Sequence, residues 1–266
     1  MSATRWSRYV ALGDSFTEGL NDDEPVDHPA VATPDRYSGW ADRLAALLAA
    51  DAEADGRPFD YANLAVRGRL LADVAGPQVD AALALGPDLV SIVGGGNDIL
   101  RPRADVDRLA VQLDGAVARL RASGADVLLC TPVDPRFAPV IRHTRSRVAT
   151  VTAHINAIAR ERGAYVIDMW AMRVLRDGRL WSTDRIHLTP EGHARVAAEA
   201  YAALTGAQRL GAPWREPLGD DLPETDLGLR ANAAWAREHA APWVRRRLTG
   251  RSSGDTVTPK RPQWRE

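Results

Sequence analysis

The sequence has little of several features that mark particular classes of protein. Its 266 residues include one cysteine, Cys130, which excludes an internal disulfide framework and a cysteine-based metal cluster. The formal net charge of −1 gives no bulk attraction to nucleic acid. No apolar stretch approaches the ~20 residues that a membrane span requires, and the residues before Tyr9 do not resemble a secretory leader. We therefore expect a soluble, cytoplasmic protein that does not bind nucleic acid.

The composition that remains is that of a folded domain. Hydrophobic residues make up 45% of the chain and charged residues 26%, which is enough for one α/β domain with an appendage. The charge is unevenly distributed, because residues 230–266 hold nine Lys/Arg against three Asp/Glu. That end carries a net +6, and the remainder of the chain is therefore acidic, at −7.

Short apolar runs alternate with segments of helical period over the first 205 residues. Apolar side chains recur at helical spacing in the segments 40–48, 106–120 and 148–158, and Thr189-Pro190 is a typical helix start. The strand alternation predicts a flavodoxin-like, three-layer α/β/α sandwich on a parallel sheet of about five strands. Five nearly all-apolar runs are the expected strands: Tyr9–Leu12, Phe59–Leu64, Asp88–Val93, Asp126–Thr131 and Ala164–Met169.

Two stretches fall outside this alternation. Residues 21–34 are acidic and proline-rich, and we expect a loop that walls a site. Residues 206–266 read as a proline-rich linker, a helical extension over Leu227–Leu248 and a basic, disordered tail from Thr249 to Glu266. We expect apolar groups such as Trp243 to pack the extension on the acidic body or on a partner subunit. Contact with anionic lipid is the alternative.

Polar and glycine-rich segments follow the expected strands. They are Gly13-Asp14-Ser15, Asn63–Gly68, Gly94–Asp98 and, before the last helix, Asp184-Arg185-Ile186-His187. Carboxyl ends of parallel strands meet at one edge of a sheet, so these segments should lie together. A serine becomes a nucleophile when a histidine removes its proton, and a carboxylate orients that histidine. Backbone N–H groups and an asparagine amide can bind the oxyanion that then forms.

These segments resemble the conserved blocks of the SGNH or GDSL hydrolases, in the family's order and over residues 8 to about 205. The resemblance implies an SGNH-type domain over residues 1–205, with Ser15 as the nucleophile. It implies that Asp184 and His187 are the carboxylate and the base, and that Gly68 and Asn97 supply oxyanion donors together with the Ser15 N–H. It further implies an esterase or lipase that needs no metal or organic cofactor and acts on a small-molecule ester or thioester.

Other functions use the same residues or the same scaffold. Acyl transfer to a sugar or lipid hydroxyl differs from hydrolysis only in the acceptor. A catalytically silent binding protein is a third possibility, which an intact set of catalytic residues disfavours. Arg67 and Arg69 depart from the family pattern beside Gly68 and suggest an anionic substrate group, although structurally paired arginines explain them equally well.

Simpler interpretations apply to single residues. Ser15 is also a typical helix cap, and Asp14 and Asp98 are typical loop-bracing residues. The run Gly94–Gly96 lacks the Lys-Ser/Thr of a phosphate loop. Ser15 does not lie in the Gly-x-Ser-x-Gly elbow of α/β-hydrolases. His193 matches no metal-ligand spacing.

Overall fold

A five-stranded parallel sheet organises the protein. The computed structural model describes residues 5–31, 37–138, 141–206, 211–219, 228–242 and 252–264. The strand order is β2-β1-β3-β4-β5 and every pairing is parallel. The predicted number and direction of strands are thus confirmed. The strands are β1 (Arg8–Leu12), β2 (Asp60–Asn63), β3 (Leu89–Ile92), β4 (Asp126–Thr131) and β5 (Tyr165–Asp168).

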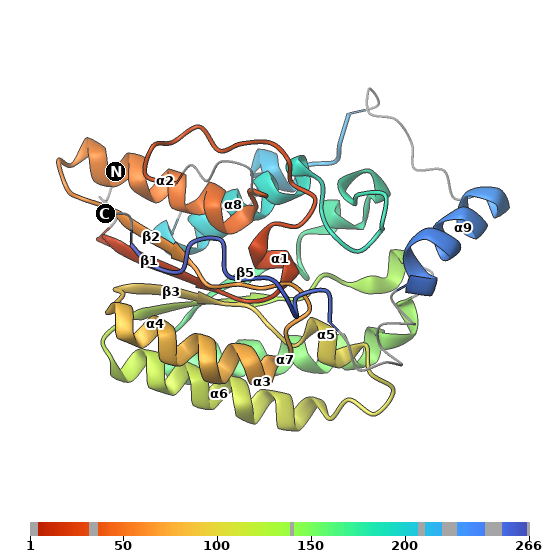
Figure 1. The fold of residues 1–266 in the computed structure, drawn as a ribbon, viewed down its shortest axis with the longest axis horizontal. Coiled ribbons are helices and arrows are strands. Elements are labelled where there is room, and N and C mark those ends of the chain that lie inside the picture. Colours follow the sequence, from red (N-terminus) through yellow and green to blue (C-terminus); the bar gives the residue numbers. More distant parts are fainter. Residues whose placement is uncertain are drawn as a thin grey trace.

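Helices cover both faces of this sheet and complete the three predicted layers (Figure 1). On one face lie α2 (Trp40–Ala54) and α8 (Pro190–Thr205). The other face is covered by α3 (Leu71–Asp73), the π-helical turn η1 (Val74–Gln78), α4 (Val79–Leu85), α6 (Val106–Ala122) and α7 (Arg145–Arg162). Shorter helical segments are α1 (Ser15–Glu18), α5 (Gly96–Ile99), α9 (Leu229–Trp235), η7 (Ala236–Ala240) and the 3₁₀ turns Pro135–Phe137, Arg142–Thr144, Arg173–Arg176, Gly178–Leu180 and Pro213–Arg215.

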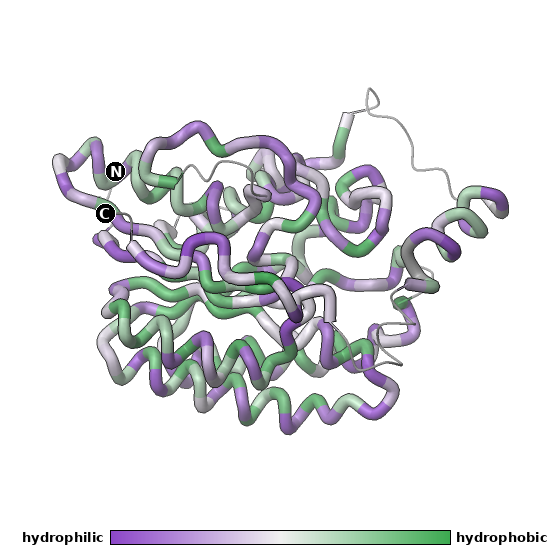
Figure 2. The backbone as a smooth tube through the Cα atoms, viewed as in Figure 1, coloured by the Kyte–Doolittle hydropathy of each residue, from purple (hydrophilic) through white to green (hydrophobic). Residues whose placement is uncertain are grey.

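Alternation along the strands divides the apolar residues between two cores. In β1, Tyr9 and Ala11 pack beneath α2 and α8, whereas Val10 and Leu12 point to α4 and α6. Successive side chains of a strand point to opposite faces, which explains why a strand covered on both sides is apolar throughout. Figure 2 shows this concentration of hydrophobic residues in the sheet and hydrophilic residues along the outer helices.

Most of the predicted helix and strand boundaries agree with the structure, but the sequence does not predict every helical segment. Thr189 caps α8 by accepting from the Gly192 N–H, with Pro190 in the first turn. The helical stretch from Leu71 to Leu85 has no counterpart in the prediction. Pro77 lies inside it, within a π-helical turn, and a proline is ordinarily a signal against a helix interior.

The C-terminal end differs from the prediction of disorder. Residues 252–264 lie against the β2 edge of the sheet, where Asn63 and Arg261 form an antiparallel bridge. Figure 1 shows this segment, in dark blue, running back across the molecule toward the side where the N-terminus lies. The prediction of a disordered tail is therefore wrong for residues 252–264, which make long-range polar contacts that composition does not reveal.

The helical extension is partly described. Helix α9 and the following turn η7 lie within the range for which we expect a helical extension. Several residues on which the packing prediction relies lie outside the described residues. They are Leu227, Trp243, Val244, Leu248 and the run Arg245-Arg246-Arg247. Within the described ranges, no helix is both long and apolar enough to cross a bilayer.

Candidate active site

The predicted site segments meet at the carboxyl edge of the sheet. Ser15 follows β1 and Asn97 follows β3, and these neighbouring strands flank the point where the strand order reverses. Connections leave β1 and β3 toward opposite faces of the sheet, and open parallel sheets bind ligands at such a point. His187 reaches the same place from the loop before α8, because its ring contacts Ser15.

Ser15, His187 and Asp184 form a continuous chain of hydrogen bonds. The Ser15 Oγ lies 2.8 Å from His187 Nε2, and His187 Nδ1 lies 2.6 Å from Asp184 Oδ2. An ionised carboxylate only accepts hydrogen bonds, so the proton of the neutral imidazole is on Nδ1. Nε2 then presents its lone pair to the serine hydroxyl. This is the geometry that a general base needs.

Asp184 is held in its ionised form by several donors. Its Oδ1 accepts from the Ser182 hydroxyl and from the N–H groups of Ile186 and His187, each at 2.9 Å. Its Oδ2 accepts from Asn21 Nδ2 at 2.9 Å. Burial opposes the charge, but the hydrogen bonds and the His187 ring lower the pKa of Asp184 well below its ordinary value. Asp184 therefore stays a carboxylate throughout the neutral range.

The nucleophile segment is fixed by its neighbours. Asp14 caps α1 by accepting from the Phe16 N–H, so Ser15 is the first helical residue rather than the cap. The first N–H groups of a helix have no intrahelical acceptor, and that of Ser15 is one of them. Gln78 exchanges two hydrogen bonds with the backbone of Gly13, at 2.8 and 2.9 Å, and so anchors the turn before it.

Gly19 ends α1 in a way that no other residue allows. Its φ is +89°, and a Cβ at this position would lie 1.3 Å from the Ser38 carbonyl oxygen. The close approach lets the chain turn sharply after the four-residue helix.

Gly68 lies in the second segment with a φ of +75°. This backbone conformation favours glycine, and a Cβ there would also lie 2.0 Å from Ser252 Oγ. Among the described residues, no hydrogen-bond acceptor is assigned to the Gly68 N–H. It is thus available to a ligand.

Asn97 is oriented by two acceptors. Its Nδ2 donates to the Arg69 carbonyl at 3.0 Å and to Asp14 Oδ2 at 3.2 Å. Burial raises the pKa of Asp14 to about 6, with the Phe16 N–H and His187 opposing the shift. Asp98 lies one residue on and accepts from the Leu71 N–H at 2.9 Å, which agrees with its expected bracing role.

The two arginines beside Gly68 differ. The Arg67 guanidinium pairs with Glu18, and it lies over the Tyr37 ring at 5.3 Å. Its charge is engaged within the protein, which favours the structural interpretation for this residue. In the part of the chain that the structure describes, the half-buried Arg69 guanidinium makes no ion pair.

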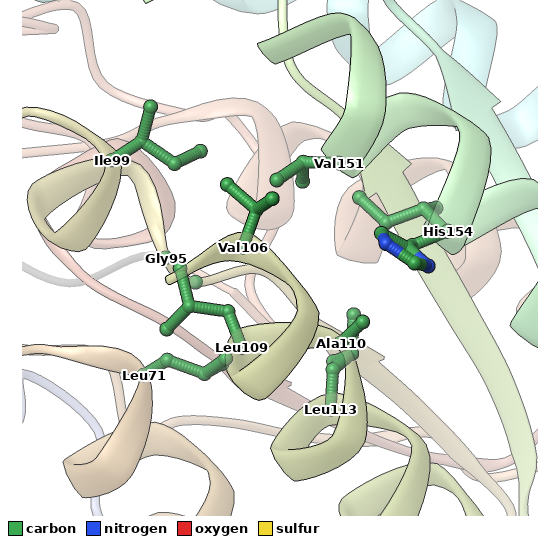
Figure 3. A pocket seen from close by; sticks show the side chains of 11 residues that line it. Leu71, Gly95, Ile99, Val106, Leu109, Ala110, Leu113, Val151 and His154 are labelled. Carbon is green, nitrogen blue, oxygen red and sulfur yellow. The ribbon is translucent and has the colours of Figure 1, made fainter. Parts of the chain in front are cut away.

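A small apolar cavity lies behind the third segment (Figure 3). Gly94, Gly95 and His154 line it together with apolar side chains of α3, α5, α6 and α7. Its volume is ≈ 20 Å³. About one water molecule needs this much space, so the cavity does not accommodate a long acyl chain in this conformation.

Several residues that shape the site carried no sequence signal of that role. Asn21 adopts a φ of +71° and reaches Asp184 from the loop that was expected to wall a site. Nothing in the sequence marks Ser182 or Gln78 as a residue that shapes the site. Asn, more than other non-glycine residues, tolerates positive φ, but this preference predicts a turn and not a partner.

Among the residues that the structure describes, the remaining titratable groups do not form a second centre. His193 is buried, its Nδ1 accepts from the Trp40 N–H, and its ring stacks on Phe16. Burial lowers the pKa of His193 to about 3, so it is neutral at physiological pH. Over the described residues, no group of His, Cys, Asp and Glu is arranged to hold a metal ion.

Fold and site geometry together define a class, the α/β hydrolytic enzymes, with the candidate residues gathered at the carboxyl edge of a parallel sheet. The model of the GDSL-like lipase/acylhydrolase family matches residues 11–195. The chain belongs to this family and is a carboxylic ester hydrolase.

Solved structures share the fold. The acetylxylan esterase Axe2 of Geobacillus stearothermophilus, a catalytic mutant, superposes with a TM-score of 0.61 at 20% identity, covering 78% of this chain and 95% of that one. TesA superposes with a TM-score of 0.55 at 24% identity, covering 75% and 99%. The esterase EstA of Pseudoalteromonas sp. gives 0.55 at 18%, covering 74% and 96%.

A curated relative points in another direction. The molybdenum cofactor guanylyltransferase of Cereibacter sphaeroides is 34% identical over 207 residues, covering 72% of this chain and all of that protein. Its name describes a different chemistry from that of the family model. The hydrogen-bonded arrangement of Ser15, His187 and Asp184 agrees with the family model, whereas the Gly94–Gly96 run continues into Asn97-Asp98 without a phosphate-loop lysine.

Proposed function

We propose that the protein cleaves esters through an acyl-enzyme on Ser15. The hydrogen-bond chain from Ser15 through His187 to Asp184 carries this proposal. His187 Nε2 removes the hydroxyl proton as Ser15 Oγ attacks the ester carbonyl. The imidazolium, stabilised by Asp184, then gives that proton to the leaving alkoxide, and the acyl group remains on Ser15.

The developing oxyanion has three candidate donors. They are the N–H groups of Ser15 and Gly68 and the amide of Asn97. The Asn97 amide nitrogen already donates two hydrogen bonds, to the Arg69 carbonyl and to Asp14. The bond to Asp14 is the longer of the two, at 3.2 Å. We infer that the oxyanion replaces this contact, while the bond to the Arg69 carbonyl keeps the amide oriented.

Deacylation repeats the same steps with a second nucleophile. His187 removes a proton from water, the hydroxide attacks the acyl-Ser15 carbonyl, and Ser15 leaves with the proton returned by His187. An alcohol in place of water would give acyl transfer with the same residues. We propose hydrolysis of a small carboxyl or acetyl ester, and the esterases among the structural neighbours support this choice.

A charged substrate group is a finer part of the proposal. Arg67 is committed to Glu18, so an anionic group, such as a phosphate or carboxylate, would be bound by Arg69. Matched neutral and anionic esters, assayed with wild type and Arg69→Ala, test this role. We expect the preference for the anionic ester to be lost in the variant. An unchanged preference removes Arg69 from the binding site.

Product analysis tests the overall reaction. Activated esters of increasing acyl length are incubated with the protein, with and without a candidate acceptor alcohol. Hydrolysis predicts free acid as the product and a highest kcat/KM for short acyl groups. Transfer of most of the acyl group to the alcohol at low acceptor concentration would instead identify an acyltransferase. A wild type that releases neither product would overturn the enzymatic proposal.

A further inference from the structure

The sequence contains a single lysine, Lys260, and the other 33 of its 34 Lys/Arg residues are arginine. Lys260 belongs to the C-terminal segment 252–264, and its side chain is 2% exposed. A buried ammonium ion is costly unless charged and hydrogen-bonding partners surround it. The partners of Lys260 therefore indicate its role.

Three oxygen atoms surround the Lys260 ammonium. Its Nζ donates to the Glu18 carbonyl at 2.6 Å, to the Tyr37 carbonyl at 2.8 Å and to Asp42 Oδ2 at 2.6 Å. An ammonium carries three donors on one compact charge, so it satisfies three oxygens that converge on a point. A planar guanidinium fork does not have this geometry. The single lysine of the chain therefore lies at a position where an arginine would not fit.

The three acceptors connect the tail with the Ser15 helix. Glu18 is the last residue of α1, whose first residue is Ser15. Asp42 lies in α2, and its second oxygen accepts from the Tyr61 hydroxyl of β2 at 3.2 Å. Burial raises the pKa of Asp42, and the positive charge of Lys260 opposes that rise. Lys260 therefore links the end of α1 to α2 and, through Asp42, to Tyr61 of β2.

Glu18 extends the connection to the loop of Gly68. The Glu18 carboxylate accepts from the Arg67 N–H at 2.7 Å and pairs with the Arg67 guanidinium. The other end of the C-terminal segment also meets this loop. A Cβ on Gly254 would lie 2.0 Å from the Arg67 carbonyl oxygen, and Ser252 lies against Gly68. The segment thus contacts both the nucleophile helix and the oxyanion loop.

We propose that residues 252–264 form a strap that positions the Ser15 helix relative to the Gly68 loop, with Lys260 as its positioning residue. This role rests on the proposed function of Ser15 and Gly68. Oxyanion donors act only when they are already aimed at the reacting carbonyl. Loss of the Lys260 contacts should therefore lower kcat and leave KM nearly unchanged.

Full-length Lys260→Met tests this role on an activated acetyl ester, at a temperature where circular dichroism shows every variant folded. We expect kcat to fall at least ~10-fold and KM to change less than about twofold. Gln263→Ala is the matched control, because Gln263 is an exposed residue of the same strap. Its kcat and Tm should equal those of wild type. An unchanged kcat in Lys260→Met overturns the strap's role while the esterase function stands.

A double variant separates positioning from stability. Lys260→Met leaves the buried Asp42 carboxylate without its partner, and Asp42→Asn in the same chain removes that charge. We expect the Tm to recover in Lys260→Met/Asp42→Asn while kcat stays low, because the Glu18 and Tyr37 carbonyls still lack their donor. Recovery of kcat together with Tm would show that Lys260 only neutralises Asp42. An inert wild type would overturn the esterase proposal and the strap's role with it.

Docking of the strap has a direct probe, because a lysine-specific protease has one site in this chain. Folded wild type should resist cleavage after Lys260, and unfolded protein should be cut once. Rapid single cleavage of the folded, active enzyme would contradict a docked strap.

Discussion

The two halves of the proposed catalytic site are held by different kinds of contact. The nucleophile side, α1 with the Gly68 loop, is braced by the ion pairs Glu18–Arg67 and Asp42–Lys260, whose carboxylates are each 5% exposed. The base side, the loop from Asp184 to His187, depends on hydrogen bonds between partly exposed groups. The Asp184 and His187 side chains are 17% and 16% exposed.

The difference matches what each side does in the proposed mechanism. Ser15 and the oxyanion donors must keep fixed positions, and ion pairs whose carboxylates are buried, which lose much when broken, provide this rigidity. His187 must gain and lose a proton in each cycle, and a carboxylate with several independent donors stabilises both states of the ring. Trp235 of α9 donates a hydrogen bond to the Asp184 carbonyl at 2.9 Å, so the helical extension contacts the base side.

The largest expected effect is on the reacting residues themselves. Ser15→Ala and His187→Ala should each abolish activity on an activated ester, with kcat falling on the order of 10⁵–10⁶-fold, because the two act as one unit. Asp184→Asn should retain more, with a loss on the order of 10⁴-fold. Steady-state kinetics of the purified variants measures this. Wild-type turnover in Ser15→Ala would refute the assignment.

Asn97 tests the oxyanion part of the nucleophile side. Asn97→Ala removes one donor and should cut kcat on the order of 100–1,000-fold with a smaller change in KM. Separate determination of kcat and KM with the same ester is the measurement. A loss confined to KM would show that Asn97 binds substrate rather than the transition state.

Asn21 is the corresponding test of the base side. Asn21→Gly accepts the φ of +71° and removes the amide that donates to Asp184. A hydrogen bond to a charged group contributes ~1.5–3 kcal/mol, so we expect kcat to fall at least about 10-fold with the fold intact. The kcat of the variant is compared with that of wild type at equal folded fraction. An unchanged kcat would mean that the remaining donors suffice to orient Asp184.

Asp14 tests the pH dependence of the free energy of unfolding rather than turnover. The pKa of Asp14 is raised from 3.8 to about 6, so the folded state binds this proton more tightly than the unfolded state. Its stabilising contribution is complete below pH 3.8 and is lost as pH rises through 6. Asp14→Asn keeps the helix cap and removes this dependence. Relative to wild type, the variant should gain up to about 3 kcal/mol between pH 4 and pH 7, measured by urea unfolding. An equal difference at both pH values would contradict the shift.

The two sides of the site also differ in how far the sequence predicts them. On the base side, Asp184 and His187 are three residues apart, and their spacing is legible in the sequence. On the nucleophile side, Glu18–Arg67 spans 49 residues and Asp42–Lys260 spans 218. Strands and helices follow from local periodicity, and these predictions are confirmed. No local pattern indicates that a charged, glycine- and proline-containing tail will dock, because its stability comes from partners distant in sequence.

The helix from Leu71 to Leu85 illustrates the same limit. Gly76 and Pro77 are signals against a helix, yet Val74 and Val79 are fully buried beneath the sheet. Tertiary packing of such residues outweighs weak local propensity. Arg67 shows the same limit at the site. An arginine at this position suggests that the substrate carries an anionic group, but in the structure its guanidinium pairs with Glu18.

An acyl-enzyme on Ser15 is tested most directly by the site at which a fluorophosphonate probe labels the protein covalently. Intact-mass measurement should show one adduct per chain, and peptide mapping should place it on Ser15. The adduct should be absent from Ser15→Ala and formed much more slowly in His187→Ala. Stoichiometric labelling of another residue, or of none in an enzyme that hydrolyses esters, would contradict an acyl-enzyme on Ser15.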